Sequence, residues 1–325
     1  MPKVSVVIPA FNSAKYIAAA IDSALGQTYK ELEVVVVDDG SEDDTGRVVR
    51  QVEGAIVYRY QANQGAGTAR NLGVSLSAGE WIAFLDADDI WYPDKVAVQM
   101  QYVISHPGVD FVYSDIDVMD ENGNLTETGH LLSKQSRRKK KPRENLVSVF
   151  FDGRPFPYPS TVVVKKTLFQ SVGGFNPNFH GNYHEDFELF ARMARISDLH
   201  FIPRSLAMYR SGNDRGERGY RSWDENGLVL LSCLRELSAG DTHKLAVLQR
   251  YFAKHFSDWG KHCLAAGDCR QARECFQKSF SYAPLHWKNL SRWFLSYLPP
   301  LWRQRVIQGA KLRRDASARA QDTGR

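Results

Sequence analysis

The stretch WIAFLDADDIW, residues 81–91, places a run of apolar residues directly before a cluster of acids. Trp81 to Leu85 form the apolar run, and Asp86, Asp88 and Asp89 follow within four positions. Such a run is typical of a strand that is buried on both faces of a sheet. Three carboxylates at its end repel one another unless something neutralises them. The stretch therefore predicts a buried strand whose end binds a cation.

The first 120 residues alternate between apolar runs and helix-like segments. Ile17, Ile21 and Leu25 recur every four residues behind Asn12 and Ser13, which are residue types that cap helices. Strands that are apolar throughout and joined by helices predict an α/β fold with a mostly parallel sheet covered on both faces. Besides residues 80–85, the expected strands are residues 4–10, 32–41, 55–60 and 109–118.

Polar side chains follow four of the expected strands at the point where each strand ends: Asn12, Asp38, Asp39, Asn63, Asp86 and Asp88. In open parallel sheets, ligands bind beyond these carboxyl ends. The Asp-x-Asp spacing puts the carboxylates of Asp86 and Asp88 on the same side of an extended backbone. Mg²⁺ and Mn²⁺ prefer such oxygens and often keep a phosphate as a further ligand. We therefore expect a divalent-cation site here, and a solvated acidic loop is the alternative.

Composition sets wider bounds on the function. The chain has 325 residues and a formal net charge of +5, which does not by itself indicate a nucleic-acid partner. No run approaches 18 apolar residues, and no signal peptide is visible, so we expect a cytoplasmic protein without a membrane span. The four cysteines form no CxxC pair and have no histidines at zinc-finger spacing, which argues against zinc and for buried thiols.

Three other chemistries match parts of the pattern less well. Phosphatases of the haloacid-dehalogenase type also place Asp-x-Asp after a strand, but early in their domain, and with Thr or Val where this chain has Ile90. A dinucleotide fingerprint fails because GAGTAR, residues 65–70, puts Arg70 at the third glycine. Nucleotidyltransferases carry a glycine-rich basic loop after the first strand, and PAFNSAKY, residues 9–16, is not one.

Five motifs in one order are similar to those of family 2 glycosyltransferases. They are VSVVIPAFN, VVVVDDGSEDDT, NQGAGTARNLGV, WIAFLDADDIWYPDKV and GGFNPNFHGNYHEDFELFARM. The resemblance covers about residues 3–210. It implies the GT-A fold, a Rossmann-like arrangement of strands and helices, and inverting sugar transfer from a nucleotide sugar. UDP is the favoured nucleotide, the acceptor is a glycan or a lipid-linked glycan, and surface polysaccharide synthesis is the expected setting.

The resemblance assigns a nucleotide-binding role to several residues. Asp39 matches the carboxylate that accepts a hydrogen bond from the base, and Asp38 supports the same pocket. Phe11 matches an aromatic residue that packs on the base, with plain core packing as its alternative. Arg70 is placed to reach the nucleotide or its phosphates, with an exposed helix arginine as its alternative. The complete set is Pro9, Ala10, Phe11, Asp38, Asp39, Arg70 and Asp86.

The remaining roles concern the metal and the acceptor. Asp88 matches the direct ligand of Mg²⁺ or Mn²⁺, and Asp86 assists it through the ribose or a metal-bound water. Asp186 resembles the catalytic base that deprotonates the acceptor hydroxyl. Glu185 competes for the base role or lies with His184 at the acceptor site. For His184, a purely structural role is the alternative. Asp89 is interpreted as the residue that initiates the next helix.

The sequence after residue 220 is expected to be helical. Phe256, Trp259, Gly260, Cys263, Ala272, Phe276 and Pro284 fit tetratricopeptide spacing, with an ordinary helical hairpin as the alternative. Residues 285–314 are aromatic, basic and amphipathic, which suits either an anionic membrane surface or packing against the preceding helices. The basic run at 136–143 is read as a solvated loop or a contact with an anionic acceptor or lipid.

The predicted organisation is a GT-A domain over residues 1–220, a helical extension over 221–314 and a disordered tail over 315–325. The predicted activity is metal-dependent, inverting sugar transfer. The alternatives are a dehalogenase-like phosphatase and a catalytically silent adaptor that uses the helical tail. Peripheral contact with the inner face of a membrane through residues 285–314 is part of the prediction, and nucleic acid is not.

Overall fold

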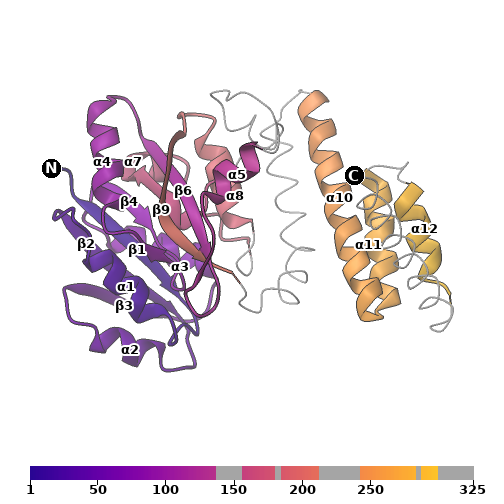
Figure 1. Ribbon diagram of the computed structural model, residues 1–325, viewed down its shortest axis with the longest axis horizontal. Coiled ribbons are helices and arrows are strands. Elements are labelled where there is room, and N and C mark those ends of the chain that lie inside the picture. Colours follow the sequence, from indigo (N-terminus) through magenta and orange to yellow (C-terminus); the bar gives the residue numbers. More distant parts are fainter. Residues whose placement is uncertain (137–155, 180–183, 212–241, 283–286, 299–325) are drawn as a thin grey trace, which may run out of the picture. The chain divides into compact units, whose positions relative to one another are not determined.

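The structure, a computed structural model, describes residues 1–136, 156–179, 184–211, 242–282 and 287–298 (Figure 1). The chain divides into two compact units, Met1–Ala239 and Gly240–Arg325. The predicted boundary near residue 220, the basic run from residue 137 onward and the predicted tail at 315–325 lie outside the described residues.

The first unit is an α/β domain built on one mixed sheet of nine strands. The strand order is β3-β2-β1-β4-β8-β6-β9-β5, with β7 paired to β6. The strands β3, β2, β1 and β4 are mutually parallel, whereas β8 pairs antiparallel with both β4 and β6. The strands are β1 (Val4–Ala10), β2 (Leu32–Asp39), β3 (Ile56–Gln61), β4 (Trp81–Phe84), β5 (Ile90–Trp91), β6 (Phe111–Met119), β7 (Leu125–Glu127), β8 (Val162–Lys165) and β9 (His200–Arg210).

Helices cover both faces of this sheet because the central strands are apolar on both sides. In β2, Val35 and Val37 pack with Ala69 of α3, while Val34 and Val36 belong to the main core cluster. Burying such β-branched side chains on both faces is what a parallel sheet requires. The helical elements of this unit are α1 (Ile17–Leu25), α2 (Thr45–Gln51), α3 (Ala66–Leu76), α4 (Lys95–Ser105), α5 (His130–Ser136), the short η1 (Pro159–Thr161), α7 (Lys166–Ser171) and α8 (Glu185–Met193).

The register of the parallel strands brings their carboxyl ends together. Ala10 at the end of β1 pairs with Asp38 of β2, and Asp38 pairs with Tyr60 of β3. Helix α3 packs closely on this sheet at Gly73, where an added Cβ would lie 2.4 Å from Cγ1 of Val7. The α/β class and the mostly parallel core of the sheet are confirmed.

Two local predictions are wrong. Asn12 and Ser13 do not cap α1 with their side chains, because the helix begins at Ile17 and Asn12 adopts a left-handed conformation with φ of 47°. Asp89 does not initiate a helix, because a short strand, β5, follows it and α4 begins only at Lys95. In both places a polar side chain binds a distant segment instead of the nearby helix end.

The second unit contains a hairpin formed by α10 (Thr242–Ala266) and α11 (Cys269–Tyr282), followed by α12 (Trp287–Leu295) (Figure 1). The helices α10 and α11 approach closely at Gly260, where an added Cβ would lie 2.8 Å from the ring of Phe276. Phe256, Trp259 and Ala272 are buried in the hairpin. Pro284 of the tetratricopeptide pattern lies outside the described residues. No helix in the described part of the chain is long and apolar enough to cross a membrane.

Candidate functional site

The end of β2 carries two buried aspartates that bind different partners. Asp38 accepts hydrogen bonds from the Ser41 amide at 2.9 Å and the Tyr58 hydroxyl at 2.8 Å. Asp39 accepts from the side chain of Gln61 at 2.6 Å and from the amides of Gln64 and Gly65 at 2.9 and 2.8 Å. Its carboxylate is therefore held by neutral donors from the end of β3 and from the loop that leads into α3.

The end of β1 supplies one exposed aromatic side chain. Pro9 and Ala10 are buried in the strand, whereas Phe11 is 41% exposed. Core packing, the alternative for Phe11, is therefore wrong. The backbone amide of Asn12 donates to Ser41 Oγ at 3.0 Å, and its side-chain Oδ1 accepts from the backbone amide of Glu42 at 2.9 Å. These bonds fix the β1 end against the loop that follows β2.

Arg70 of α3 forms an ion pair with the first of the acids that follow β4. It is 4% exposed, so the alternative of an exposed helix arginine is wrong. Its guanidinium donates to Asp86 Oδ1 at 2.6 Å and to Glu185 Oε1 at 3.0 Å. Burial by itself would lower the pKa of Arg70, but Asp86 and Glu185 outweigh it and raise that pKa, so the side chain stays cationic.

The first turn of α8 places the two predicted base candidates in different surroundings. Glu185 is buried and ion-paired, and burial raises its pKa despite the opposing effect of Arg70. Asp186 is half-buried, and burial together with the charge of Glu185 raises its pKa to about 7. A carboxyl that titrates near neutrality suits proton transfer at physiological pH. His184, in a left-handed conformation with φ of 70°, has its pKa lowered to about 4 by burial.

Sequence reasoning missed the residues that hold the acidic turn in place. Asp89 is 1% exposed and accepts from Ser160 Oγ at 2.6 Å and from the Arg210 amide at 3.0 Å. Burial, with the charges of Asp88 and Asp86, raises the pKa of Asp89 well above its usual value. Arg210 also donates through Nε to the Asp88 carbonyl at 2.9 Å. Ser160 and Arg210 come from distant segments, so no local motif marks them.

The acids near β4 and α8 outnumber the cations that the described residues bring to them. Asp86, Asp88, Asp89, Glu185 and Asp186 interact electrostatically, and Arg70 and Arg210 contact this group. Among the described residues no group of three or more His, Cys, Asp or Glu side chains forms a metal site by itself. The oxygen chemistry of Asp86 and Asp88 nevertheless fits Mg²⁺ or Mn²⁺, which commonly bind through one or two carboxylates plus phosphate oxygens.

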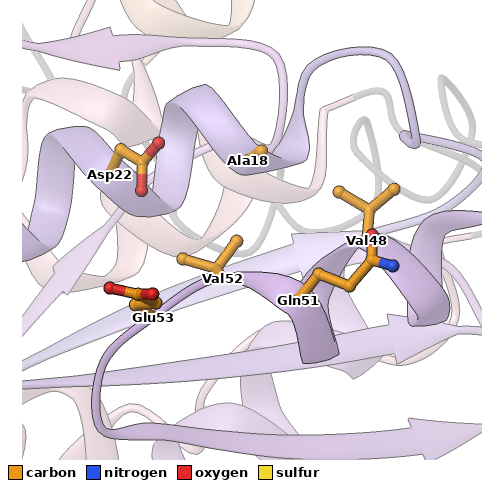
Figure 2. Close-up of a pocket in the computed structure, with 6 residues that line it drawn as sticks. All are labelled: Ala18, Asp22, Val48, Gln51, Val52 and Glu53. Atoms are coloured by element: carbon orange, nitrogen blue, oxygen red, sulfur yellow. The ribbon is translucent and has the colours of Figure 1, made fainter.

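A separate hollow lies between α1 and the end of α2. Figure 2 shows its lining, which is Ala18, Asp22, Val48, Gln51, Val52 and Glu53. These side chains come from the helices and the turn after α2, not from the strand ends. The hollow is therefore distinct from the acidic cluster.

A family model described as glycosyl transferase family 2 matches residues 5–173, just over half of the chain. The chain belongs to glycosyl transferase family 2. This membership agrees with the five ordered motifs. The matched region contains the ends of β1, β2 and β4 but stops before α8.

Individual relatives cover different shares of the chain. A Rickettsia prowazekii protein described as an uncharacterized glycosyltransferase is 32% identical over 201 residues, which are 62% of this chain and 61% of that protein. The Escherichia coli glucosyltransferase WfaP is 37% identical over 117 residues, which are 35% of this chain and 46% of WfaP. The chain thus spans about three fifths or less of the length of these relatives.

The crystal structure of Staphylococcus aureus TarS, residues 1–349, has a TM-score of 0.59 and 19% identity, over 94% of this chain and 92% of that one. Its similarity supports the GT-A fold predicted from the motifs.

Proposed function

We propose that this chain is an inverting, metal-dependent glycosyltransferase that moves a sugar from a nucleotide diphosphate sugar to a hydroxyl of a glycan or glycolipid acceptor. The observation that carries the proposal is the ion-paired cluster in which Arg70 binds both Asp86 and Glu185 beside Asp186. This cluster brings an acidic strand end, where a divalent cation would bind, and a carboxyl of near-neutral pKa around one buried arginine. Those are the two groups that sugar transfer from a diphosphate needs.

UDP is the proposed nucleotide. The TarS structures include complexes with UDP and with UDP-GlcNAc, and WfaP is named for its use of UDP-Glc. In this chain the carboxylate of Asp39 accepts three hydrogen bonds, and a carboxylate has about four acceptor positions. Among the described residues, this leaves one acceptor position of Asp39 for an N–H of the base. Phe11, exposed at the end of β1, would cover the base from one side.

The proposed reaction is a direct displacement. The acceptor oxygen forms a bond to the anomeric carbon as the bond from that carbon to the diphosphate oxygen breaks, and the electron pair leaves with the diphosphate. Asp186 accepts the proton of the acceptor hydroxyl. Asp88, assisted by Asp86, would hold a divalent cation, which when bound stabilises negative charge on the diphosphate. Attack from the face opposite the leaving group inverts the anomeric centre.

A screen of nucleotide sugars tests this proposal. The full chain would be incubated with UDP-, GDP- and dTDP-sugars and, in parallel, with phosphate esters, each with Mn²⁺, Mg²⁺ or chelator. Thermal stabilisation and the release of nucleotide or inorganic phosphate are measured. We expect stabilisation by a UDP-sugar that requires the metal. Release of inorganic phosphate from phosphate esters, without response to any nucleotide sugar, would favour the phosphatase alternative. No response at all would favour the silent adaptor.

A further inference from the structure

We infer that Glu185 is a positioning residue that acts through Arg70, and that this ion pair holds the start of α8 against the end of β4. The inference rests on the proposed function, because it concerns how Asp186 is aimed as the base. It also separates the roles of two adjacent acids that the sequence leaves in competition.

Arg70 joins three elements at one buried point. Its guanidinium projects from α3 and bonds the carboxylates of Asp86, after β4, and Glu185, the first residue of α8. Beneath it lies the ring of Phe175, 5.3 Å from the guanidinium carbon. A planar guanidinium offers donors in fixed directions, so the positions of its two acidic partners are fixed relative to each other.

The first turn of α8 depends on this contact for its placement. His184 precedes the helix in a left-handed conformation and provides no side-chain cap. The side chain of Glu185 lies directly on α3, where a Cβ added to Gly67 would be 3.4 Å from Glu185 Cγ. Asp186 is the next residue, and its Oδ1 accepts from the Phe187 amide at 2.7 Å. The direction of Asp186 is therefore set by the same turn that Glu185 anchors.

Burial makes Glu185 a poor partner for an acceptor hydroxyl. Glu185 is 4% exposed, and one of its oxygens is committed to Arg70. Asp186 is the more exposed of the two acids. Neutralising Glu185 leaves Arg70 ion-paired with Asp86 alone, so the contact that ties the start of α8 to Arg70 should weaken.

The variants Glu185→Gln and Arg70→Lys, with their double variant, test this coupling. Each single change should lower kcat by about 10- to 100-fold and raise KM for the nucleotide sugar, because Arg70 also binds Asp86. The double variant should lose about as much as the worse single variant, because both changes break one unit. Glu185→Asp keeps the charge but shortens the reach, and we expect an intermediate loss of kcat.

Glu188→Gln is the matched control. Glu188 lies one turn later in α8, is 2% exposed, and bonds Arg192 through both carboxylate oxygens at 2.6 and 2.7 Å. Arg192 in turn binds the Gly174 carbonyl at 2.7 Å, on a segment that contributes no acid to the cluster. This variant should lower Tm while kcat and KM stay within about twofold.

Three results would overturn the inference. One is a double variant whose loss equals the product of the two single losses. The second is a kcat of Glu185→Gln as low as that of Asp186→Asn, provided that Asp186→Asn still turns over. The third is a loss of kcat in Glu188→Gln equal to the loss in Glu185→Gln. Failure of the unmodified chain to transfer sugar would instead overturn the proposed function, so the two failures are distinguishable.

Discussion

The end of β2 and the start of α8 hold their carboxylates in opposite ways. Asp39 is buried among neutral donors that come from the end of β3 and the loop into α3. Glu185 and Asp186 are held at the start of a helix whose position depends on Arg70, 115 residues away from Glu185 in sequence. The first arrangement joins residues at most 26 positions apart and uses two backbone amides and one side chain. The second is non-local and leaves carboxyl groups with raised pKa values, which is where proton chemistry is expected.

The largest expected effect is at Asp186. Asp186→Asn removes the proton acceptor but keeps the size of the side chain, so kcat should fall by about 10²- to 10⁴-fold. Affinity for UDP in the presence of Mn²⁺, measured by calorimetry, should stay within about threefold. Substantial turnover by this variant would transfer the base role to another residue and remove the contrast between the two regions.

Asp88→Ala tests the proposed metal site at the end of β4. Loss of the proposed metal ligand should lower kcat/KM by on the order of 10²-fold at a fixed Mn²⁺ concentration. Raising the Mn²⁺ concentration should restore part of this loss. A matching change, Asp94→Ala, removes an acid that forms an exposed ion pair with Arg204, and it should leave turnover unchanged. Equal losses in the two variants would argue against a metal role for Asp88.

The pH dependence of activity should report the ionisation of Asp186 and the influence of Glu185 on it. Burial and Glu185 raise the pKa of Asp186 to about 7, and the base must be ionised to accept a proton, so activity should fall about tenfold per pH unit below that value. Glu185→Gln removes one of the charges that raise this pKa, and the acid limb should therefore move to lower pH. An acid limb that stays in place would show that Glu185 does not influence the group that titrates.

A packing change on α3 should affect stability without a direct effect on the acids. Gly73→Ala would place its Cβ 2.4 Å from Cγ1 of Val7, and overpacking of this kind costs about 1–3 kcal/mol. Denaturant unfolding of the variant should show that loss. The exposed Ser75 of the same helix provides the control, because Ser75→Ala should be within about 0.5 kcal/mol of the unmodified chain.

The smallest expected effect concerns α12. Phe294 and Tyr297 are 58% and 57% exposed, and a basic sequence follows them, which supports the proposed contact with an anionic membrane. Replacing both with Ser in the full chain should reduce flotation with phosphatidylglycerol vesicles about threefold. Ile196→Ser is the control, because Ile196 is 61% exposed but belongs to the other unit. Unchanged flotation would contradict the contact.

Much of the proposed nucleotide-sugar site at the ends of β1, β2 and β4 could be predicted from the sequence, because its motifs are short and contiguous. The run from Val34 to Val37 predicts a buried strand, and Asp38 and Asp39 follow it directly. The strand β9 was not predicted, because its buried, half-buried and exposed positions follow no regular alternation and its sequence has no continuous apolar run. The contacts of Arg210 with Asp88 and Asp89 join residues more than 120 positions apart, and no spacing rule reports such a pairing.

The acidic stretch after β4 shows the same division. The apolar run and the need for neutralisation follow from the residues alone. The identity of one neutraliser, Arg70, could not be read from spacing, and the family resemblance gave this residue a nucleotide contact, with an exposed helix arginine as the alternative. Asp89 is neutralised differently, since burial raises its pKa while Ser160 and the Arg210 amide hold it. Long-range packing decided both.

Calorimetric titration of UDP into the full chain tests the central claim most directly. The titration would be run with Mn²⁺ and with chelator, on the unmodified chain and on Asp88→Ala. We predict tight binding by the unmodified chain with Mn²⁺, and binding at least about tenfold weaker both with chelator and in the variant. Equal affinity in all of these conditions, or no binding of UDP in any of them, would contradict a metal-dependent nucleotide-sugar site at the end of β4.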